Sequence, residues 1–226
     1  MTIKRIGLLG GTFNPVHFGH LQLAEAAMAE CNLDQVVFIP SCQPPHKDAA
    51  SITSFSHRIA MLQIVGANNK RLSCMAIERE LPTPSYTIDT LRAIADRFPV
   101  GVNFFFIIGA DAFLDLLSWK SYEEILQRVT LFVAGRKGYP ADRLSKFLKS
   151  LQYEDHGRFW RGNDGFREII LLQSVPEGYS STAIRKQISK GTFPKEAIPG
   201  AVIDYIKEHA LYQPSKVETE ICASMD

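Results

Sequence analysis

Short apolar runs alternate along the chain with longer stretches of helical hydrophobic patterning. The short runs are rich in β-branched and aromatic residues, and several are apolar almost throughout, which is typical of strands buried on both faces of a sheet. Six such runs predict strands at residues 3–9, 35–40, 71–77, 102–108, 129–134 and 168–173. The longer stretches predict helices at residues 19–30, 56–66, 87–97, 121–127, 143–151, 182–190 and 201–208.

This alternation predicts a mainly parallel sheet with helices on both faces, that is, a Rossmann-like, doubly wound α/β fold. The last two helices follow the sixth strand and predict a helical C-terminal part. We expect one domain over residues 1–212 and a frayed polar tail at 213–226. The polar stretch 153–167 is expected to be a surface excursion and not a domain linker.

The composition is that of an ordinary globular protein. Of the 226 residues, 46% are hydrophobic and 22% are charged, and the formal net charge is +1. The chain can therefore bury a full core, and its charge gives no reason to expect nucleic acid or a membrane as partner. No apolar run approaches the roughly 18 residues of a membrane span, and the opening MTIKRIGLLGG is followed by no cleavage-like site. We expect a cytoplasmic location.

The four cysteines form no CxxC pair and show no regular spacing. A zinc ribbon or a disulfide framework would need such a pattern. We therefore expect free thiols in a reducing compartment at Cys31, Cys42, Cys74 and Cys222.

The stretch GLLGGTFNPVHFGH, residues 7–20, lies where the first predicted strand passes into the first helix. In open α/β sheets, ligands bind at this carboxyl end of the strands. Gly10 and Gly11 let the backbone turn tightly and approach a ligand. His17 and His20 are three residues apart near a helix N-terminus, where N–H groups and the dipole favour an anion. Because imidazoles can donate hydrogen bonds to phosphate oxygens or carry positive charge, the stretch predicts a phosphate-binding loop.

Two other interpretations of the histidine pair stay open from the residues alone. The pair could hold a metal ion, although no third protein ligand is evident. It could also be two packed structural histidines. The position directly after a strand and a double glycine favours phosphate binding over both.

A second stretch, GYSSTAIRKQI, residues 178–188, follows the last predicted strand and opens another helix. Ser180, Ser181 and Thr182 occupy cap positions, so simple helix capping is one interpretation. Consecutive hydroxyls at a helix N-terminus also suit a phosphate, and Arg185 one turn further could add a charge-assisted contact. Two helix starts of this kind predict a polyphosphate held between them.

Together the two stretches resemble the nucleotidyltransferase superfamily marked by an HxGH motif near the N-terminus and an SSTxxR-like motif near the C-terminus. From Ile6 to about Tyr212 the chain is similar to bacterial nicotinate-nucleotide adenylyltransferases, including FIPSCQPPHK, PSYTIDTL, FIIGADAFLDLLSWKSYEEIL and AGRKGYP. Related phosphopantetheine adenylyltransferases are shorter and lack the PPHK and PSYT segments. The resemblance implies transfer of AMP from ATP to nicotinate mononucleotide, giving deamido-NAD and pyrophosphate in NAD biosynthesis.

The resemblance also implies a mechanism. The acceptor phosphate attacks the α-phosphorus of ATP in line, without a covalent enzyme intermediate, and Mg²⁺ bound through the ATP phosphates neutralises the triphosphate. His17 and His20 would grip the phosphates, and His20 would stabilise charge that develops in the transition state. The residues implied to bind ATP are Gly10, Gly11, Thr12, Phe13, His17, His20, Gly109, Asp111, Arg136, Ser180, Ser181, Thr182 and Arg185.

On the acceptor side, Trp119 resembles an aromatic residue that stacks on the nicotinate ring, although taken alone a tryptophan in LDLLSWKSY predicts core packing. Thr87 and the backbone near Lys120 resemble groups that meet the nicotinate carboxylate. His46 and Lys47 would approach the acceptor phosphate. The residues implied to bind the acceptor are His46, Lys47, Ser85, Tyr86, Thr87, Trp119 and Lys120.

The chain departs from the family pattern at Asn14, Ser41, Lys137 and Tyr179, and two alternative functions stay open. Asn14 stands where many members of the superfamily carry aspartate, and we expect this difference to alter a turn more than the chemistry. The alternatives are the same transfer to nicotinamide mononucleotide or phosphopantetheine, and a non-catalytic nucleotide-binding sensor. The sequence leaves the oligomeric state open, a homo-oligomer included.

Overall fold

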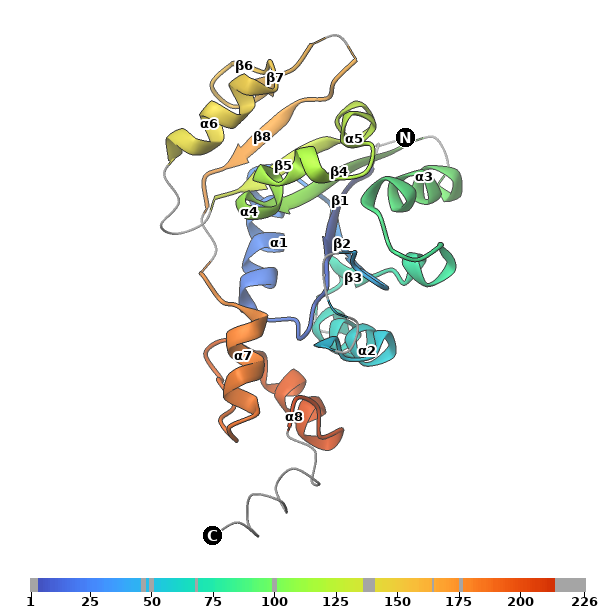
Figure 1. The fold of residues 1–226 in the computed structure, drawn as a ribbon, viewed down its shortest axis with the longest axis vertical. Helices are drawn as coiled ribbons and strands as arrows, with labels where there is room; N and C mark the ends of the chain where they lie inside the picture. The colour runs from blue at the N-terminus through green and yellow to red at the C-terminus, as the bar shows by residue number, and fades with distance from the viewer. Residues whose placement is uncertain are drawn as a thin grey trace.

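The computed structural model describes residues 4–45, 48, 51–67, 69–98, 101–135, 141–163, 165–174 and 177–213. Within these ranges, eight strands form one sheet in the order β3-β2-β1-β4-β5-β8-β7-β6 (Figure 1). The strands are β1 (Lys4–Gly11), β2 (Gln35–Pro40), β3 (Leu72–Cys74), β4 (Val102–Gly109), β5 (Thr130–Ala134), β6 (Glu154–Asp155), β7 (Trp160–Arg161) and β8 (Ile169–Leu172). Neighbours from β3 to β8 pair in parallel, whereas β7 pairs antiparallel with β8 and with β6.

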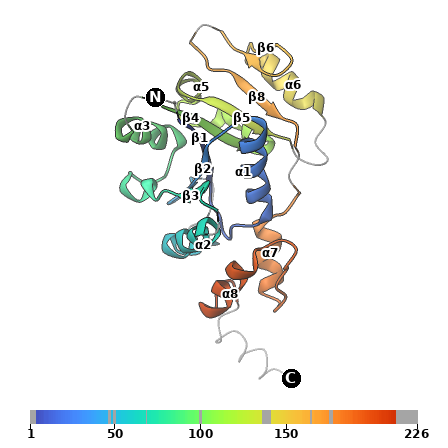
Figure 2. The same cartoon turned by 180° about the vertical axis from the view of Figure 1, so that it is seen from behind.

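Helices cover both faces of the sheet, as Figures 1 and 2 show for α1 and α3. The first face carries α1 (Phe18–Glu30), α2 (Phe55–Ala67), α7 (Ser181–Ile188) and α8 (Gly200–Glu208). The second face carries α3 (Thr87–Arg97), α4 (Ala110–Leu114), α5 (Tyr122–Arg128) and α6 (Ala141–Ser150). The described residues also form the 3-10 helices η2 (Ile77–Glu80) and η3 (Leu116–Ser118). The sheet therefore separates two apolar cores, and the Rossmann-like α/β prediction is confirmed.

Successive side chains of the central strands enter the two cores in turn, because side chains of a strand alternate between faces. Leu9 and Phe38 pack in the first core, and their neighbours Leu8 and Ile39 pack in the second. Strands buried on both faces must be apolar at every position, which is the pattern from which they were predicted. Within the described residues, no helix is long and apolar enough to span a membrane.

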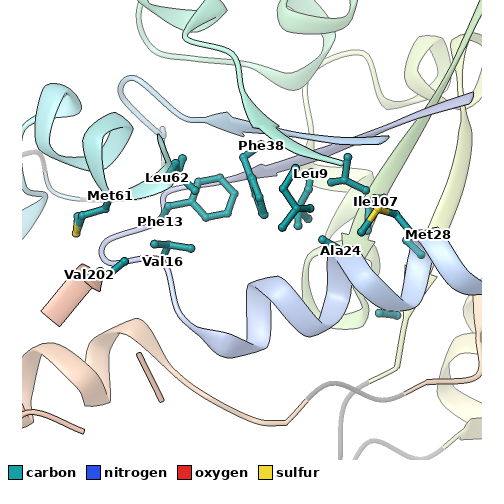
Figure 3. Packing of buried hydrophobic residues seen from close by; sticks show 14 of the residues in the cluster. Leu9, Phe13, Val16, Ala24, Met28, Phe38, Met61, Leu62, Ile107 and Val202 are labelled. Carbon is teal, nitrogen blue, oxygen red and sulfur yellow. The ribbon is translucent and has the colours of Figure 1, made fainter. Parts of the chain in front are cut away.

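The first core joins the C-terminal helices to the segment between β1 and α1. Phe13 and Val16 of this segment pack against Met61 and Leu62 of α2 and against Val202 of α8 (Figure 3). In both overall views, α7 and α8 lie together at the end of the molecule where β1 passes into α1 (Figures 1 and 2). The C-terminal part therefore supports the loop that carries the histidines.

The sheet order reverses at β1, which pairs with β2 on one side and β4 on the other. After β1 the chain continues into α1 on one face, and after β4 it continues into α4 on the opposite face. Such a reversal opens a crevice at the carboxyl ends of the two strands. Gly11 ends β1 and Gly109 ends β4, so the predicted ligand-binding edge lies at this crevice.

Two sequence predictions need correction. The strand predicted at 71–77 ends at Cys74, because Ile77 and Glu78 are buried within the 3-10 turn η2. The stretch 153–167 is not a simple surface excursion, because it contains β6 and β7, which extend the sheet beyond β8. Tyr153 and Trp160 are 2% and 4% exposed and pack in the second core. Tyr153 and Trp160 were not recognised as core residues, because the strands at or beside them have two residues each and are too short to show an alternating apolar pattern.

The prediction of free thiols is confirmed within the described residues for Cys31, Cys42 and Cys74. Burial raises the pKa of Cys31 to about 11 and that of Cys74 to about 12, so both stay protonated. Cys222 lies outside the described residues.

Candidate active site

A cavity of about 1170 Å³ lies at the crevice between the ends of β1 and β4. It collects side chains from both ends of the sequence. The predicted site residues that line it are Gly10, Gly11, Thr12, His17, His20, Ser85, Tyr86, Thr87, Gly109, Asp111, Trp119, Lys120, Ser180, Ser181, Thr182 and Arg185. His46, Lys47 and Arg136 lie outside the described residues. The geometry therefore unites the two motifs and the acceptor segments in one space.

His17 and His20 meet at the start of α1. His17 is the N-cap and His20 the third helical residue, and their rings stack with centroids 3.7 Å apart at 21°. The backbone N–H of His17 donates to Nδ1 of His20 at 3.2 Å. Because Nδ1 accepts, the neutral His20 ring carries its proton on Nε2 and can donate from there. This places an oriented donor ring at a helix N-terminus.

His17 is 6% exposed and cannot easily hold a charge. Burial lowers its pKa from 6.5 to about 4. Of the two roles expected for His17, hydrogen-bond donation fits this neutral ring, and a standing positive charge at neutral pH does not. Its Nδ1 is buried without a hydrogen-bond partner among the described residues.

The lowered pKa of His17 predicts a pH-dependent stability. The pKa of His17 is about 4 in the folded state and 6.5 without the burial. Below about pH 6.5 the unfolded chain therefore binds a proton that the folded protein does not, and the free energy of unfolding falls until the pH approaches 4. The shift corresponds to about 3 kcal/mol. Between pH 7 and pH 4, urea unfolding should show a smaller loss of unfolding free energy in His17→Gln than in wild type. Equal losses in both proteins would contradict a buried neutral ring.

The double glycine acts through close packing and does not form the tight turn that was predicted. Both glycines still belong to β1, and the left-handed turn residue is Phe13, with φ of 49°. A Cβ on Gly10 would lie 3.3 Å from the Phe106 ring, and one on Gly11 would lie 3.1 Å from the Phe13 ring. A Cβ on Gly109 would meet nothing within 4 Å, so the backbone there is open to close approach by a ligand.

Phe13 lies beneath the site and does not line it. Its side chain is 1% exposed and contacts the His20 ring edge-on, with centroids 4.9 Å apart. It also packs against Phe38 in the core (Figure 3). The phenyl ring therefore supports His20, and the implied contact between Phe13 and ATP is not available to this side chain.

The hydroxyls of the second motif do not serve as helix caps. Ser180 is the N-cap of α7, but its side chain makes no capping hydrogen bond. Ser181 Oγ donates instead to the carbonyl of Pro15 at 3.1 Å, and Arg185 Nη1 donates to the carbonyl of Asn14 at 2.8 Å. The start of α7 is thus fastened to the histidine loop, which favours the interpretation of a shared anion site over simple capping.

Asn14 has a larger role than the turn residue that was expected. It is 3% exposed, and its Oδ1 accepts from the Tyr212 hydroxyl at 2.9 Å and from the Thr53 N–H at 3.2 Å. Its Nδ2 donates to the carbonyl of Ser51 at 3.2 Å. An aspartate could not make this last bond, because it has no donor when ionised. Asn14 therefore joins the histidine loop, the start of α2 and the C-terminal part.

The acceptor end of the cavity is formed by α3 and η3. Trp119 is half-buried, contacts Phe106 edge-on at 6.4 Å and also lines the cavity. Lys120 donates to the Asp89 carboxylate at 2.9 Å and lies over the Tyr86 ring at 4.7 Å. Because Thr87 begins α3, the N-terminus of this helix faces the cavity, where it favours an anionic group.

Sequence reasoning missed two charged residues of this region, Arg58 and Glu78, which are 1% and 6% exposed. Arg58 lies three residues after Phe55 and three before Met61 on the apolar side of α2. A charge on an apolar stripe is the signal that could have identified it. Glu78 gave no such signal, because it directly follows the segment predicted as a strand and stands in a charged stretch, residues 78–80.

The metal interpretation of the histidine pair finds no support in the described residues. No group of three or more His, Cys, Asp or Glu side chains within them could hold a metal ion. The donors that line the cavity are mainly imidazole, hydroxyl and guanidinium groups, which suit phosphate oxygens.

The family model described as cytidylyltransferase-like matches residues 8–187, from β1 to the end of α7. The match includes both motifs that meet at the cavity. The fold and the site together therefore define a nucleotidyltransferase of the cytidylyltransferase-like class.

Curated relatives narrow the class. The "Probable nicotinate-nucleotide adenylyltransferase" of Desulfotalea psychrophila (strain LSv54 / DSM 12343) is 42% identical over 212 residues, which are 93% of this chain and 100% of the relative. The protein of the same name from Synechococcus sp. (strain JA-3-3Ab) is 39% identical over 209 residues, which are 92% and 95% of the two chains. The chain therefore belongs to the nicotinate-nucleotide adenylyltransferase family.

A solved structure agrees with the fold. Plasmodium falciparum nicotinic acid mononucleotide adenylyltransferase complexed with NaAD has a TM-score of 0.73 to this chain at 21% identity. The similarity covers 92% of this chain and 97% of the other. At this identity, the likeness concerns the fold.

Proposed function

We propose that this protein transfers AMP from ATP to nicotinate mononucleotide, forming deamido-NAD and pyrophosphate. The observation that carries the proposal is the junction of the two motifs, in which Ser181 and Arg185 donate to the backbone of Pro15 and Asn14. Both helix starts then face one cavity, whose other end is formed by Trp119 and the N-terminus of α3. A triphosphate and a pyridine nucleotide fit these two ends by charge and by shape.

On the ATP side, the phosphates lie between the N-termini of α1 and α7. Thr182, Ser180 and Arg185 hold the β- and γ-phosphates, and the neutral His17 adds a hydrogen bond. His20 donates from Nε2 to the phosphoryl oxygens, where negative charge grows as the acceptor attacks. The transfer uses no covalent nucleophile of the protein, so positioning and charge stabilisation perform it. Gly109 leaves room for the adenosine to approach the backbone, beside Asp111.

Mg²⁺ fits this site as a partner of the nucleotide. The cavity supplies phosphate-binding donors, and Mg²⁺ in nucleotide sites is held largely by phosphate oxygens and water. When bound, it neutralises charge on the departing pyrophosphate. The residues of the chain then need only to orient the magnesium nucleotide.

On the acceptor side, Trp119 stacks on the pyridine ring and the N-terminus of α3 receives the carboxylate through Thr87. The Lys120 ammonium adds positive potential, although its pairing with Asp89 reduces that effect. An amide in place of the carboxylate would gain less from the helix N-terminus, which supports nicotinate over nicotinamide as the acceptor.

Trp119→Ala is expected to raise the KM of nicotinate mononucleotide about tenfold and to change kcat less, because stacking contributes about 1–3 kcal/mol per base. Leu117→Ala is the matched control, because Leu117 is an exposed side chain in the same turn, 51% exposed. Steady-state kinetics with saturating ATP would measure both variants. An unchanged KM in Trp119→Ala would assign the indole to core packing alone.

The proposed function is tested by pyrophosphate release from the purified protein with ATP and Mg²⁺. Nicotinate mononucleotide, nicotinamide mononucleotide and phosphopantetheine are offered separately. We expect strong turnover with nicotinate mononucleotide only. Turnover with another acceptor would overturn the acceptor assignment and keep the ATP site, whereas ATP binding without turnover on all three would favour a sensor.

A further inference from the structure

Two buried charged side chains beside the cavity have no role in the proposed transfer. They are Arg58 of α2, 1% exposed, and Glu78 of η2, 6% exposed. Charged side chains are almost never fully buried unless they are paired. Their partners therefore indicate what the two charges hold in place.

Both charges are directed at the turn that follows β2, residues 41–43, which we call the β2 turn. Arg58 donates through Nη1 to the Ser41 carbonyl at 2.7 Å and through Nη2 to the Cys42 carbonyl at 3.2 Å. Glu78 accepts the N–H of Cys42 at 3.0 Å through Oε2. The backbone of Cys42 is therefore held by a guanidinium at its carbonyl and by a carboxylate at its N–H.

Arg58 extends this arrangement to two further segments. It donates through Nη1 to the carbonyl of Thr12, in the histidine loop, at 2.9 Å. It also donates through Nε to the carbonyl of Thr53, before α2, at 2.9 Å. One guanidinium thus fixes the β2 turn against the loop that binds ATP.

Glu78 extends the arrangement to α3. Its Oε1 accepts from the Thr90 hydroxyl at 2.9 Å. The β2 turn also reaches the start of α3 directly, because Gln43 N–H donates to Ser85 Oγ at 3.1 Å and Ser85 N–H donates to the Gln43 carbonyl at 2.9 Å. Ser85 is itself one of the residues expected to meet the acceptor.

The two charges also stabilise each other. Burial raises the pKa of the Glu78 carboxyl, whereas hydrogen bonds from Ser85, Cys42 and Thr90 and the charge of Arg58 lower it. Burial lowers the pKa of Arg58, and the negative charge of Glu78 is among the causes that raise it.

We propose that Arg58 and Glu78 are positioning residues for the acceptor. Glu78 joins the β2 turn to Ser85 and Thr90 at the start of α3, and Arg58 holds the same turn against the histidine loop. This inference rests on the proposed function. Glu78 lines the cavity, but a carboxylate would repel an acceptor that carries a phosphate and a carboxylate. Its presence there is explained by the backbone that it holds and not by substrate contact.

The variant Glu78→Gln distinguishes a positioning role from simple charge repulsion, because the two predict opposite changes in the KM of nicotinate mononucleotide. If Glu78 acts only as an unfavourable charge, its removal lowers the KM of nicotinate mononucleotide. If it positions the β2 turn, the KM rises, because the amide oxygen cannot replace both acceptors facing Cys42 and Thr90. We expect a rise of about tenfold, the effect of losing one hydrogen bond to a charged group. The Kd of ATP, measured by calorimetry without acceptor, should change less than about twofold.

Glu80→Gln is the matched control, since Glu80 lies in the same 3-10 helix and makes an exposed pair with Arg97. Both constants should stay unchanged in it. Thr90→Val provides a second test should Glu78→Gln fail to fold by circular dichroism. It removes one partner of Glu78 without changing the charge, and it should raise the same KM by a smaller factor.

The outcomes distinguish this inference from the proposed function. An unchanged or lowered KM in the folded variants, with wild-type turnover intact, overturns the positioning role and leaves the function standing. Absence of wild-type turnover with nicotinate mononucleotide overturns the function. Hydrogen exchange then decides the positioning role, because faster exchange of the amides of Cys42, Gln43 and Ser85 in Glu78→Gln than in Glu80→Gln supports it, and equal exchange overturns it.

Discussion

His20→Ala is expected to lower kcat by about 10²- to 10³-fold, the usual effect of removing one donor aimed at developing charge. The His20 ring is held by the His17 N–H, by stacking on the His17 ring and by the edge of Phe13, so its donor nitrogen is oriented before substrate binds. Because the loss concerns the transition state, the Kd of ATP should change much less than kcat. Pyrophosphate release and calorimetry measure the two quantities.

His156→Ala is a suitable control for this variant. His156 lies between β6 and β7, at the edge of the sheet far from β1, and stacks on Phe159. The His156→Ala variant loses an imidazole that does not line the cavity, so its kcat should equal that of wild type. A kcat within about threefold of wild type in folded His20→Ala would remove His20 from the chemistry.

Arg185→Gln is expected to raise the KM of ATP about 10- to 100-fold. The variant loses a charge-assisted contact with the triphosphate, worth about 1.5–3 kcal/mol. It also loses the hydrogen bond to the Asn14 carbonyl that fastens α7 to the histidine loop. Steady-state kinetics at saturating acceptor would show the change, with a smaller effect on the KM of nicotinate mononucleotide.

Lys186→Gln removes the same charge from the next residue of α7, whose side chain is exposed and does not line the cavity. It controls for the net charge of the protein, and its KM for ATP should stay at the wild-type value. Arg185→Lys should fall between wild type and Arg185→Gln, because an ammonium keeps the charge without the fork of donors. Equal constants for Arg185→Gln and Lys186→Gln would contradict a specific role of Arg185.

The fold was predictable because four neighbouring strands, β1, β2, β4 and β5, are largely buried on both faces and appear as mainly apolar runs between helical patterns. The same criterion fails where only one side chain anchors a short strand. β7 has two residues, and Trp160 alone of these enters the core. The 3-10 helix η2 was missed because Met75, Ala76 and Ile77 continue the apolar run of β3 beyond Cys74, where the strand ends.

The site was predictable where one segment carries the chemistry, as with His17 and His20 or with Ser181 and Arg185. Contacts made between distant segments left no such pattern. Asn14 bonds to Tyr212, 198 residues later, and nothing in the sequence around either residue indicates the other. Arg58 bonds to backbone carbonyls, which every residue possesses, so the identities of its partners give no signal.

The fastening of α7 and Tyr212 to Asn14 has a consequence for protein synthesis. Asn14 of the histidine loop is translated early, whereas its partners Arg185 and Tyr212 follow 171 and 198 residues later. A nascent chain halted before α7 can form β1, β2 and β4 and still has half of the triphosphate site. We expect such fragments to bind the nucleotide poorly and to form no dinucleotide, because the residues that complete the triphosphate site and fasten the histidine loop are missing.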